Sequence, residues 1–566
     1  MAGPALARMV GAVRQAPRAT LSGQNYVVAS WLLEPHGQVD SERQLAWIGA
    51  LRDVPESVNL ENSCKMGGDY ALVAGRPDCL LLARGRFASR CLYFARLPDG
   101  GVAACSRLEP LAACLNNVTA NVRTLAALVL AQTSDDLSAT VFNEIYRVDA
   151  AQSILLGGEG VVCNNQGDVD FITRKESPDE LAEELHSTLQ RVIYRAIEGI
   201  PRVAVLVSGG LDSSGVLAHT MAAARRTSGT QVDAISWSFG GPGDDRPYLR
   251  ELCDSLGILP HLVSTAEASA NVVRALTADG SPFIWATCAG ILTASDRARA
   301  LGAQAVLTGM GGDEVFAGDR RAIAERVWSR NSFEAIPRTV RLCPNSGKVQ
   351  LLRIAKLLFG PTITQKCPGF ARFRRRRSTS KTWSWAGPRL LEVIREVHVD
   401  SVISRDYTNE AKIRSLTRKS FVIYAENRRQ FEAASGVQHI DPLLDDEVVA
   451  LLATFPQDIL LFGDRQRGIY RHATRSLLPD RLRLRPDKGQ FEPATAEMVR
   501  RSDLSALMDL ASMRMLGDLG LVDPTSYRRC FDDLLSGARD DWARMWPPLA
   551  VEAFVRSRWG VSPGAA

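Results

Sequence analysis

The sequence predicts an α/β protein whose larger part is built on a parallel sheet. Apolar, strand-like runs alternate with helical segments in its middle third, which is typical of β-α-β units. The strand-like runs are Val203–Val207, Val232–Phe239, His261–Ser264 and Gln304–Thr308. Helical segments at Arg246–Gly257 and Ala289–Leu301 lie between them. Two of these strands run into glycine-rich turns that carry acidic residues.

The first of these turns is SGGLDSS, at Ser208–Ser214. Gly209 and Gly210 can adopt backbone angles that are closed to other residues, so a phosphate can approach the main chain closely. Free amides and the positive end of the helix dipole then hold the anion. Further hydrogen-bond donors are the hydroxyls of Ser208, Ser213 and Ser214. The alternative interpretation is a turn that merely links strand to helix.

Acidic residues in both turns point to a metal ion. Asp212 would repel a bare phosphate, so its presence favours a bridging Mg²⁺, which takes carboxylate and phosphate oxygens together. The second turn, GMGGDEVFAG at Gly309–Gly318, carries Asp313. Because ligands bind at the carboxyl ends of strands in open α/β sheets, we expect Asp313 to meet Asp212 across one metal.

Two common nucleotide-binding motifs are absent. The pattern GxxxxGK(S/T) has no match, since NSGKVQ at Asn345–Gln350 lacks the first glycine and the hydroxyl residue, which disfavours kinase or GTPase chemistry. The pattern GxGxxG fails because Glu314 occupies its final glycine position, so a dinucleotide-binding fold is not supported. SGGLDSS instead resembles the pyrophosphatase loop of ATP-cleaving enzymes that form acyl-adenylates.

The order and spacing of these motifs resemble the asparagine synthetase superfamily, whose members activate a carboxylate with ATP and pass it to an amine. The resemblance continues in DPLLDDEVVALL at Asp441–Leu452 and in Arg471–Phe491, and it extends from about Asn25 to Phe491. It implies that ATP and Mg²⁺ bind, with adenine against Trp237–Phe239. The implied ATP-binding residues are Val207, Ser208, Gly209, Gly210, Asp212, Ser213, Ser214, Ser238, Thr308 and Gly309.

The same resemblance implies a catalytic group of Asp212, Asp313 and Lys488. Lys488 lies in RPDKGQF and is similar to a late lysine of the family that reaches the α-phosphate. A fixed ammonium there would stabilise negative charge as the amide forms. The alternative is a surface lysine in an arginine-rich segment. Arg483 and Arg485 flank it and could assist with pyrophosphate, and the sequence does not choose between them.

The front third resembles the family's amidohydrolase domain. Gly67–Ala113 contains short alternating strands separated by turn residues, as expected for a layered sheet sandwich. The family's domain releases ammonia from glutamine with a cysteine at its mature N-terminus. Here Ala2 follows Met1 and the first cysteine is Cys64, so we expect no ammonia supply.

These features divide the chain in two. Acidic residues gather around Glu176–Glu184, before an amphipathic helix that leads to Arg195. We expect an inactive, degenerate glutamine amidotransferase-like domain over residues 1–175 and an ATP-dependent synthetase domain over residues 176–566. The predicted fold class is α/β, with an N-terminal degenerate Ntn-amidohydrolase-like sandwich. This sandwich is followed by a C-terminal parallel-sheet domain of the pyrophosphatase-loop (adenine nucleotide alpha hydrolase-like) type, with additional helices.

Departures from the family point to an unusual substrate. Met310 stands where an asparagine synthetase has Glu and a β-lactam synthetase has Tyr, and a thioether cannot relay protons. Gln438, His439 and Ile440 replace the segment with the Glu and Arg that shape the amino-acid pocket. Such a site would hold free aspartate poorly. We expect a larger substrate, and for His439 a role in core packing or a surface hydrogen bond.

This combination resembles the lasso peptide cyclases. They adenylate an Asp or Glu side chain of a precursor peptide, and the peptide's own N-terminal amine closes a macrolactam. A leader peptidase and a leader-binding protein are further partners that this resemblance suggests. The alternatives are a small-molecule amide ligase of the β-lactam synthetase or asparagine synthetase type, and a non-catalytic scaffold.

Composition agrees with a globular protein. The 566 residues are 46% hydrophobic and 23% charged, which is ordinary for such proteins. Eleven cysteines without a CxxC pair, and no apolar signal segment, favour a reducing cytoplasm. No apolar run approaches the roughly 20 residues of a membrane span. We expect no membrane association, and Leu125–Gln132 is interpreted as a core helix.

The net charge of +5 is small, but basic residues cluster at Phe370–Arg377, FARFRRRR. One interpretation is a solvated loop. The other is an electrostatic guide for an acidic precursor or partner, because clustered charge raises encounter rates. The four arginines Arg374 to Arg377 do not decide between them. Since no nucleic-acid reader motif accompanies the charge, we expect no nucleic-acid partner.

Overall fold

The computed structural model describes most of the chain. The described residues are 19–22, 27–30, 38–40, 44–318, 383–400, 409–485 and 491–560, with gaps at 50, 53, 77–78, 87–89, 116, 135, 158–159, 166–171, 173, 228, 240–243 and 278–279. Lys488, the segment Asn345–Gln350 and the basic stretch Phe370–Arg377 lie outside the described residues.

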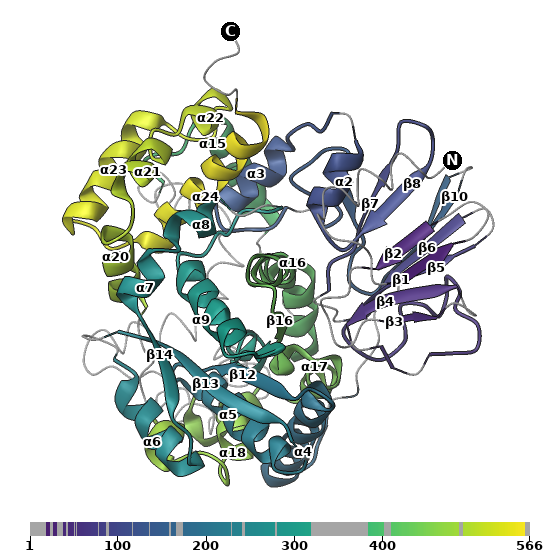
Figure 1. Cartoon of the computed structure of the whole chain (residues 1–566), viewed down its shortest axis with the longest axis vertical. Helices are drawn as coiled ribbons and strands as arrows, with labels where there is room; N and C mark the ends of the chain where they lie inside the picture. The colour runs from purple at the N-terminus through teal and green to yellow at the C-terminus, as the bar shows by residue number, and fades with distance from the viewer. Residues whose placement is uncertain are drawn as a thin grey trace, which may run out of the picture.

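Antiparallel sheets form the N-terminal part, drawn in purple and blue in Figure 1. The strand orders are β11-β10-β6-β5-β4-β3, β8-β7-β9 and β1-β2. The strands are β1 (Ala19–Ser22), β2 (Val27–Ser30), β3 (Gln38–Asp40), β4 (Leu45–Gly49), β5 (Tyr70–Gly75), β6 (Cys79–Arg84), β7 (Tyr93–Arg96), β8 (Val102–Cys105), β9 (Tyr146–Arg147), β10 (Gln152–Gly157) and β11 (Gly160–Asn165). Leu72 and Leu81 of the central strands β5 and β6 lie in one hydrophobic core, whereas Ala71 and Leu82 lie in another, so this part of the six-stranded sheet is buried on both faces.

A five-stranded parallel sheet forms the next layer, with the order β14-β13-β12-β15-β16. Its strands are β12 (Arg202–Leu206), β13 (Gln231–Ser238), β14 (Pro260–Ser264), β15 (Ala305–Leu307) and β16 (Gln438–Ile440). Because β12 and β15 are parallel neighbours, the loops that follow them leave the sheet at the same edge. This is the edge where ligands bind in such sheets.

Helices cover both faces of this sheet (Figure 1). Val203 and Val205 face the core that α4 (Pro178–Ile197) and α5 (Leu211–Ala224) complete. Ala204 faces the opposite core, which α9 (Cys288–Ala300) completes. A strand that is apolar on both faces is expected where a parallel sheet is buried between helices.

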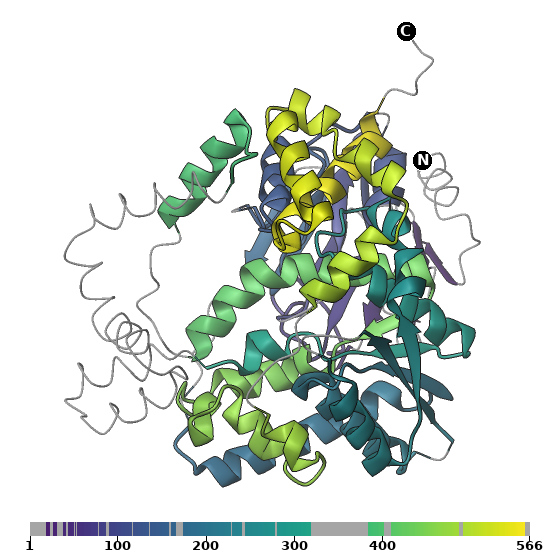
Figure 2. The same cartoon turned by 90° about the vertical axis from the view of Figure 1, so that its left-hand side faces the viewer.

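The remaining helices are mostly C-terminal. They are α2 (Leu108–Cys114), α3 (Val122–Val129), α6 (Arg246–Leu256), α7 (Thr265–Ser269), α8 (Val272–Leu276), α10 (Gly312–Phe316), α15 (Pro388–Asp400), α16 (Asn409–Ser435), η1 (Pro442–Leu444), α17 (Asp446–Ala453), η2 (Ile459–Asp464), α18 (Gly468–Ala473), α19 (Asp480–Arg483), α20 (Glu492–Arg500), α21 (Leu504–Leu510), α22 (Arg514–Asp518), α23 (Pro524–Ser536) and α24 (Trp542–Trp559). In Figure 2, α15 lies at the left of the molecule, and α16 runs from the left toward its centre. Residues of α3 share a hydrophobic core with α24, and the rings of Phe142 and Phe554 lie 6.1 Å apart.

The predicted fold class is confirmed: antiparallel sheets precede a parallel sheet that is covered by helices. Of the segment interpreted as a core helix, Leu125–Val129 lie in α3 and are buried, whereas residues 130–132 follow the helix. The helix expected after the acidic stretch is α4, but it begins earlier, at Pro178, so most of the acidic stretch lies inside the helix. Its N-terminus has a capping box of Ser177 and Glu180. The division at residue 175 stays a prediction.

The nine described cysteines are all free thiols. In that part of the chain, no helix combines the length and the apolar character that crossing a bilayer requires.

Buried His219 is expected to make stability depend on pH. Its Nδ1 lies 2.8 Å from the carbonyl oxygen of Gly215, and burial lowers the pKa of His219 from 6.5 to about 4. Below about pH 6.5 the unfolded chain therefore binds a proton that the folded chain does not, and the unfolding free energy falls by about 2 kcal/mol by about pH 5. We expect the melting temperature of His219→Gln to fall less over this range than that of the wild type. Equal falls would contradict this assignment.

Candidate functional site

The first glycine-rich turn connects β12 to α5. Gly210 is the N-cap of α5 and no side chain caps the first amides of the helix. Gly209 has a φ of +74°, and a Cβ there would lie 2.6 Å from the carbonyl oxygen of Asp245. Only glycine fits this position without displacing backbone. The turn thus presents uncapped amides, as an anion site requires.

The serines of this turn differ in their surroundings. Ser208 and Ser213 are partly exposed, and their hydroxyl oxygens lie 3.2 Å apart. The Gly210 amide donates to Ser208 Oγ over 3.3 Å. Ser214 differs from the prediction, because its side chain is fully buried in the first turn of α5 and its hydroxyl has no hydrogen-bond partner in the described part of the chain. In this structure Ser214 supports the helix from inside and does not present its hydroxyl to a phosphate.

The second glycine-rich turn packs directly on the first. It follows β15 and leads into α10. A Cβ on Gly309 would lie 2.5 Å from the amide nitrogen of Ser213, and one on Gly312 would lie 2.3 Å from Cγ of Asp212. Both glycines are therefore needed for the two turns to approach. Their contact places Asp212 beside Asp313, as the sequence predicts.

Arg467 joins the two carboxylates. Its Nη1 lies 2.5 Å from Oδ2 of Asp212, and its Nη2 pairs with Oδ1 of Asp313. Burial would lower the pKa of Arg467, but the two carboxylates outweigh it and the pKa is raised. Arg467 has a φ of +57°, which is unfavourable for a side chain with a Cβ and places it at the N-cap of α18. No sequence motif pointed to this residue.

The two carboxylates fit a hard cation. Both reach one guanidinium, so they face a common point, and carboxylate oxygens are the ligands that Mg²⁺ prefers. In the described residues, no group of three or more His, Cys, Asp or Glu side chains is placed to hold a metal. A cation between Asp212 and Asp313 would therefore take its other ligands from phosphate oxygens or water.

Arg485 supports the first turn. It is buried, and its Nη1 donates to the carbonyl oxygen of Gly209 over 3.2 Å and to Asp245 Oδ1 over 2.7 Å. Its guanidinium lies 4.0 Å from the ring centre of Tyr248. Arg483 instead pairs with Asp480 over 2.6 Å. Of the two arginines that the sequence left open, Arg485 is the one bound to the first glycine-rich turn.

An aromatic group lies at the end of β13, where adenine is expected. The ring of Phe491 lies 6.0 Å from that of Trp237 and 5.6 Å from that of Phe239. Between them, Ser238 is partly exposed. Val207 is buried, and its amide donates to the carbonyl oxygen of Ile235 over 2.9 Å. That amide is therefore hydrogen-bonded to the neighbouring strand β13.

A contact between Glu314 of the second turn and Tyr424 was not predicted from the sequence. Tyr424 of α16 donates a hydrogen bond to Glu314, and its ring lies 4.8 Å from that of Trp285. Burial, and then the charge of Glu314, raise the pKa of Tyr424. The phenol therefore stays protonated and acts as a donor. The two residues are 110 positions apart, and neither stands in a pattern that predicts the pair.

The strand β16 holds the residues that depart from the family pattern. Gln438 and His439 are buried. His439 Nε2 lies 3.0 Å from Ser295 Oγ, and its ring stacks on Phe431, which confirms the expected packing role. Met310 is partly buried in the second turn.

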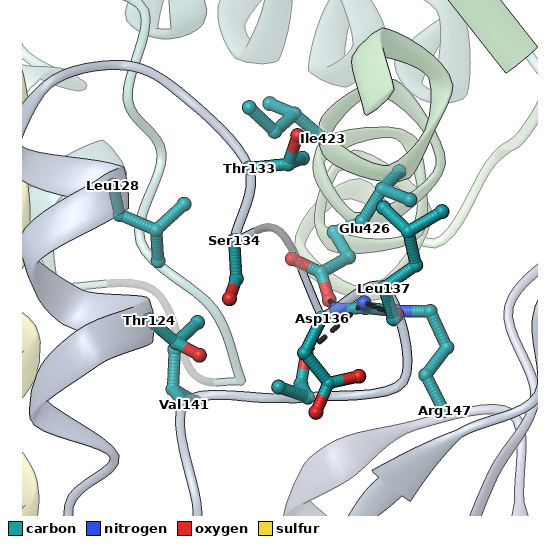
Figure 3. A pocket seen from close by; sticks show the side chains of 12 residues that line it. Thr124, Leu128, Thr133, Ser134, Asp136, Leu137, Val141, Arg147, Ile423 and Glu426 are labelled. Carbon is teal, nitrogen blue, oxygen red and sulfur yellow. Dashed lines mark hydrogen bonds and ion pairs between the residues drawn. The ribbon is translucent and has the colours of Figure 1, made fainter. Parts of the chain in front are cut away.

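A pocket outside the two turns lies between α3 and α16 (Figure 3). Glu426 of α16 and Arg147 form an ion pair there, and Thr124 also lines the wall. Tyr93 donates to Glu426 over 3.3 Å. None of the lining residues belongs to either glycine-rich turn, so the candidate site is defined by the turns and not by this pocket.

Arg467→Met is expected to change the response to magnesium. Without the guanidinium, Asp212 and Asp313 face each other without a compensating charge, so the unbound protein should lose about 2 kcal/mol of stability. The two carboxylates should then bind Mg²⁺ more tightly, and the rise in melting temperature on adding MgCl₂ should be larger than in the wild type. Arg475→Met is the control, because Arg475 is exposed and contacts only the exposed Asp179, at 3.9 Å, among the ion pairs described. An unchanged magnesium response would contradict the shared cation site.

Comparison with protein-family models agrees with the sequence motifs. The asparagine synthase family model matches residues 184–556. Among solved structures, the chain is similar to the U34-tRNA thiolase NcsA from Methanococcus maripaludis with its 4Fe-4S cluster, at 13% identity and a TM-score of 0.20. That match covers 33% of this chain and 65% of the thiolase, slightly less than two thirds of its length. No curated protein matches the chain.

Proposed function

The chain belongs to the asparagine synthase family, a family of ATP-dependent carbon–nitrogen ligases, and from this premise we propose that it closes a macrolactam in a precursor peptide. The proposed reaction is AMP-forming. An Asp or Glu side chain of the peptide is adenylated, and the peptide's N-terminal amine then forms the amide.

One observation carries the proposal: the contact between the two glycine-rich turns. Uncapped amides of α5 lie beside two carboxylates that face a common point. This arrangement suits a triphosphate with a bridging cation. It supports cleavage of ATP at the α-phosphorus, because the same turns can hold the pyrophosphate that leaves.

In the proposed reaction, the amides of α5 and the hydroxyls of Ser208 and Ser213 bind the phosphates. Asp212 and Asp313 would hold Mg²⁺, which when bound neutralises phosphate charge. The peptide carboxylate attacks the α-phosphorus, and the bond to pyrophosphate breaks. The amine nitrogen then attacks the acyl carbon, AMP leaves with the bonding electrons, and the nitrogen loses a proton. Lys488 is proposed to stabilise the charge that develops in both steps.

The substrate class rests on departures from the family pattern. Met310 offers no proton relay beside the second turn. Gln438 and His439 lie buried in β16 and so present no charged group for a free amino acid. A peptide that supplies its own amine also makes ammonia release unnecessary. Holding such a peptide in a folded conformation would supply proximity between amine and acyl carbon.

The proposal includes partners and a location. A leader peptidase and a leader-binding protein would act on the same precursor, and the basic stretch at Arg374–Arg377 would attract an acidic one. The free thiols of the nine described cysteines suit a reducing cytoplasm. No role for nucleic acid or membrane is proposed.

The test measures the nucleotide products. The peptides encoded by short reading frames beside the gene are supplied with ATP and MgCl₂, and AMP with pyrophosphate is expected only when the correct peptide is present. ADP and phosphate as products would contradict the proposal. Turnover with free amino acids and not with peptides would favour a small-molecule ligase. Glutamate release from glutamine should not exceed that in buffer.

A further inference from the structure

Buried charges connect the N-terminal sheets to α16, which lies between those sheets and α9 in Figure 1. Asp69 directly precedes β5. Its Oδ2 lies 3.2 Å from Nη2 of Arg428 and 3.6 Å from Nε of Arg90. The backbone amide of Arg90 also donates to Asp69 Oδ1 over 3.2 Å. One carboxylate of the N-terminal part is thus held by two arginines, one of them from α16.

The chain of contacts continues to the second glycine-rich turn. Nη1 of Arg428 lies 3.3 Å from Oδ2 of Asp441, which directly follows β16. The other oxygen of Asp441 accepts a hydrogen bond from the hydroxyl of Thr308. That hydroxyl oxygen in turn accepts from the amide of Met310 over 3.1 Å. Asp69 is therefore linked, through Thr308, to the backbone amide of Met310 in the turn that carries Asp313.

A second set of contacts holds β16, the strand that leads to Asp441. Nη1 of Arg90 lies 3.1 Å from Oε1 of Glu432, and the same oxygen accepts from the amide of His439 over 3.0 Å. Burial would raise the pKa of Glu432, but Arg90, Arg429 and Arg428 lower it to about 2, so the carboxylate is charged. The first set of contacts ends at Thr308, which precedes the second turn, and the second set ends at β16, which pairs with β15.

Stability alone does not account for this arrangement. Arg428 is 7% and Asp441 is 8% exposed, and removing such charges from water costs several kcal/mol for each ion. An apolar contact of similar volume is often as stable or more so. Ion pairs that include hydrogen bonds fix the relative position of the groups that they join.

We propose that Asp69 is a positioning residue for the nucleotide site, acting through Arg428 and Asp441 on the Thr308 hydroxyl. The N-terminal domain then has a role in the synthetase reaction that needs no amidohydrolase activity: it fixes the second turn, and with it Asp313, against the first. The proposal rests on nucleotide binding at the two turns and not on the identity of the peptide.

The test is a double-mutant cycle on the dissociation constant of Mg·ATP, measured by calorimetry without peptide. Asp69→Asn and Thr308→Val should each raise the dissociation constant at least about fivefold. The dissociation constant of the double variant should exceed that of the weaker-binding single variant by no more than about twofold. Asp69→Glu keeps the charge and should bind with intermediate affinity. It also replaces Asp69→Asn if that variant does not fold.

Arg52→Gln is the matched control. Arg52 also crosses between the N-terminal part and the C-terminal part, where it pairs with Asp445, Asp446 and Glu447, but none of these contacts Thr308 among the hydrogen bonds described. The Arg52→Gln variant should bind Mg·ATP with the affinity of the wild type. The proposal is overturned if Asp69→Asn binds Mg·ATP with wild-type affinity, or if Arg52→Gln loses as much affinity as Asp69→Asn. It is also overturned if the losses of the two single variants multiply in the double variant. If the wild type does not bind Mg·ATP, both the role of Asp69 and the proposed function are wrong. If it binds Mg·ATP but shows no peptide-dependent turnover, only the proposed function is wrong.

Discussion

Asp212→Asn is expected to lower peptide-dependent pyrophosphate release by at least about a hundredfold, as for the loss of one essential charge at a reacting phosphate. The change removes an anionic ligand from a hard-cation site and keeps the shape of the side chain. Shape matters here because a Cβ on Gly312 would lie only 2.3 Å from Cγ of Asp212. The rate is measured with saturating ATP and MgCl₂, and cooperative melting shows that the variant is folded.

Two further variants sharpen this result. Asp313→Asn should also abolish turnover, although its carboxylate is 46% exposed, because it faces the same guanidinium as Asp212. Asp480→Asn is the control, since Asp480 is an exposed acid whose described ion pair is with Arg483. Near-normal turnover in either site variant, with Mg²⁺ supplied, would refute the shared cation.

Lys488→Met is expected to keep Mg·ATP and peptide binding and to lower macrolactam formation at least about a hundredfold. The variant retains the length of the side chain and loses the charge. Binding should persist because the amides of the first turn and the cation make most of the phosphate contacts. Product formation is followed in a single turnover by mass spectrometry, which detects the loss of one water from the peptide.

The conservative change separates charge from geometry at the same position. Lys488→Arg should restore activity only in part, because a planar guanidinium does not reproduce a compact ammonium. If Lys488→Met forms dehydrated peptide at the wild-type rate, the lysine has no part in the reaction. The catalytic cation must then be sought among the arginines near the turns, with Arg467 first.

The local sequence predicted the parts of the site that depend on backbone geometry. SGGLDSS and GMGGDE each combine glycines with an acid directly after an apolar strand, and both turns lie where a parallel sheet puts them. The approach of Gly309 and Gly312 to the first turn also explains why these positions are glycine. The Ser214 hydroxyl was placed wrongly because a motif does not show which side of a helix turn faces the core.

Contacts between distant segments could not be predicted from single motifs. Arg467 and Asp212 are 255 positions apart, and Arg428 and Asp69 are 359 apart. Arginine is common in this chain, so nothing in the local sequence distinguishes a guanidinium that joins two carboxylates from one on the surface. The distinction comes from burial, and burial is set by how α16 and α18 pack against the sheets.

Transfer of oxygen from peptide to AMP tests the central claim most directly. A precursor peptide labelled with ¹⁸O in its carboxyl groups is incubated with the enzyme, ATP and MgCl₂, and both products are analysed by mass spectrometry. Attack of the carboxylate on the α-phosphorus predicts one ¹⁸O atom in AMP for each peptide that has lost one water. Dehydrated peptide accompanied by unlabelled AMP, or by ADP, would contradict adenylation of the peptide side chain.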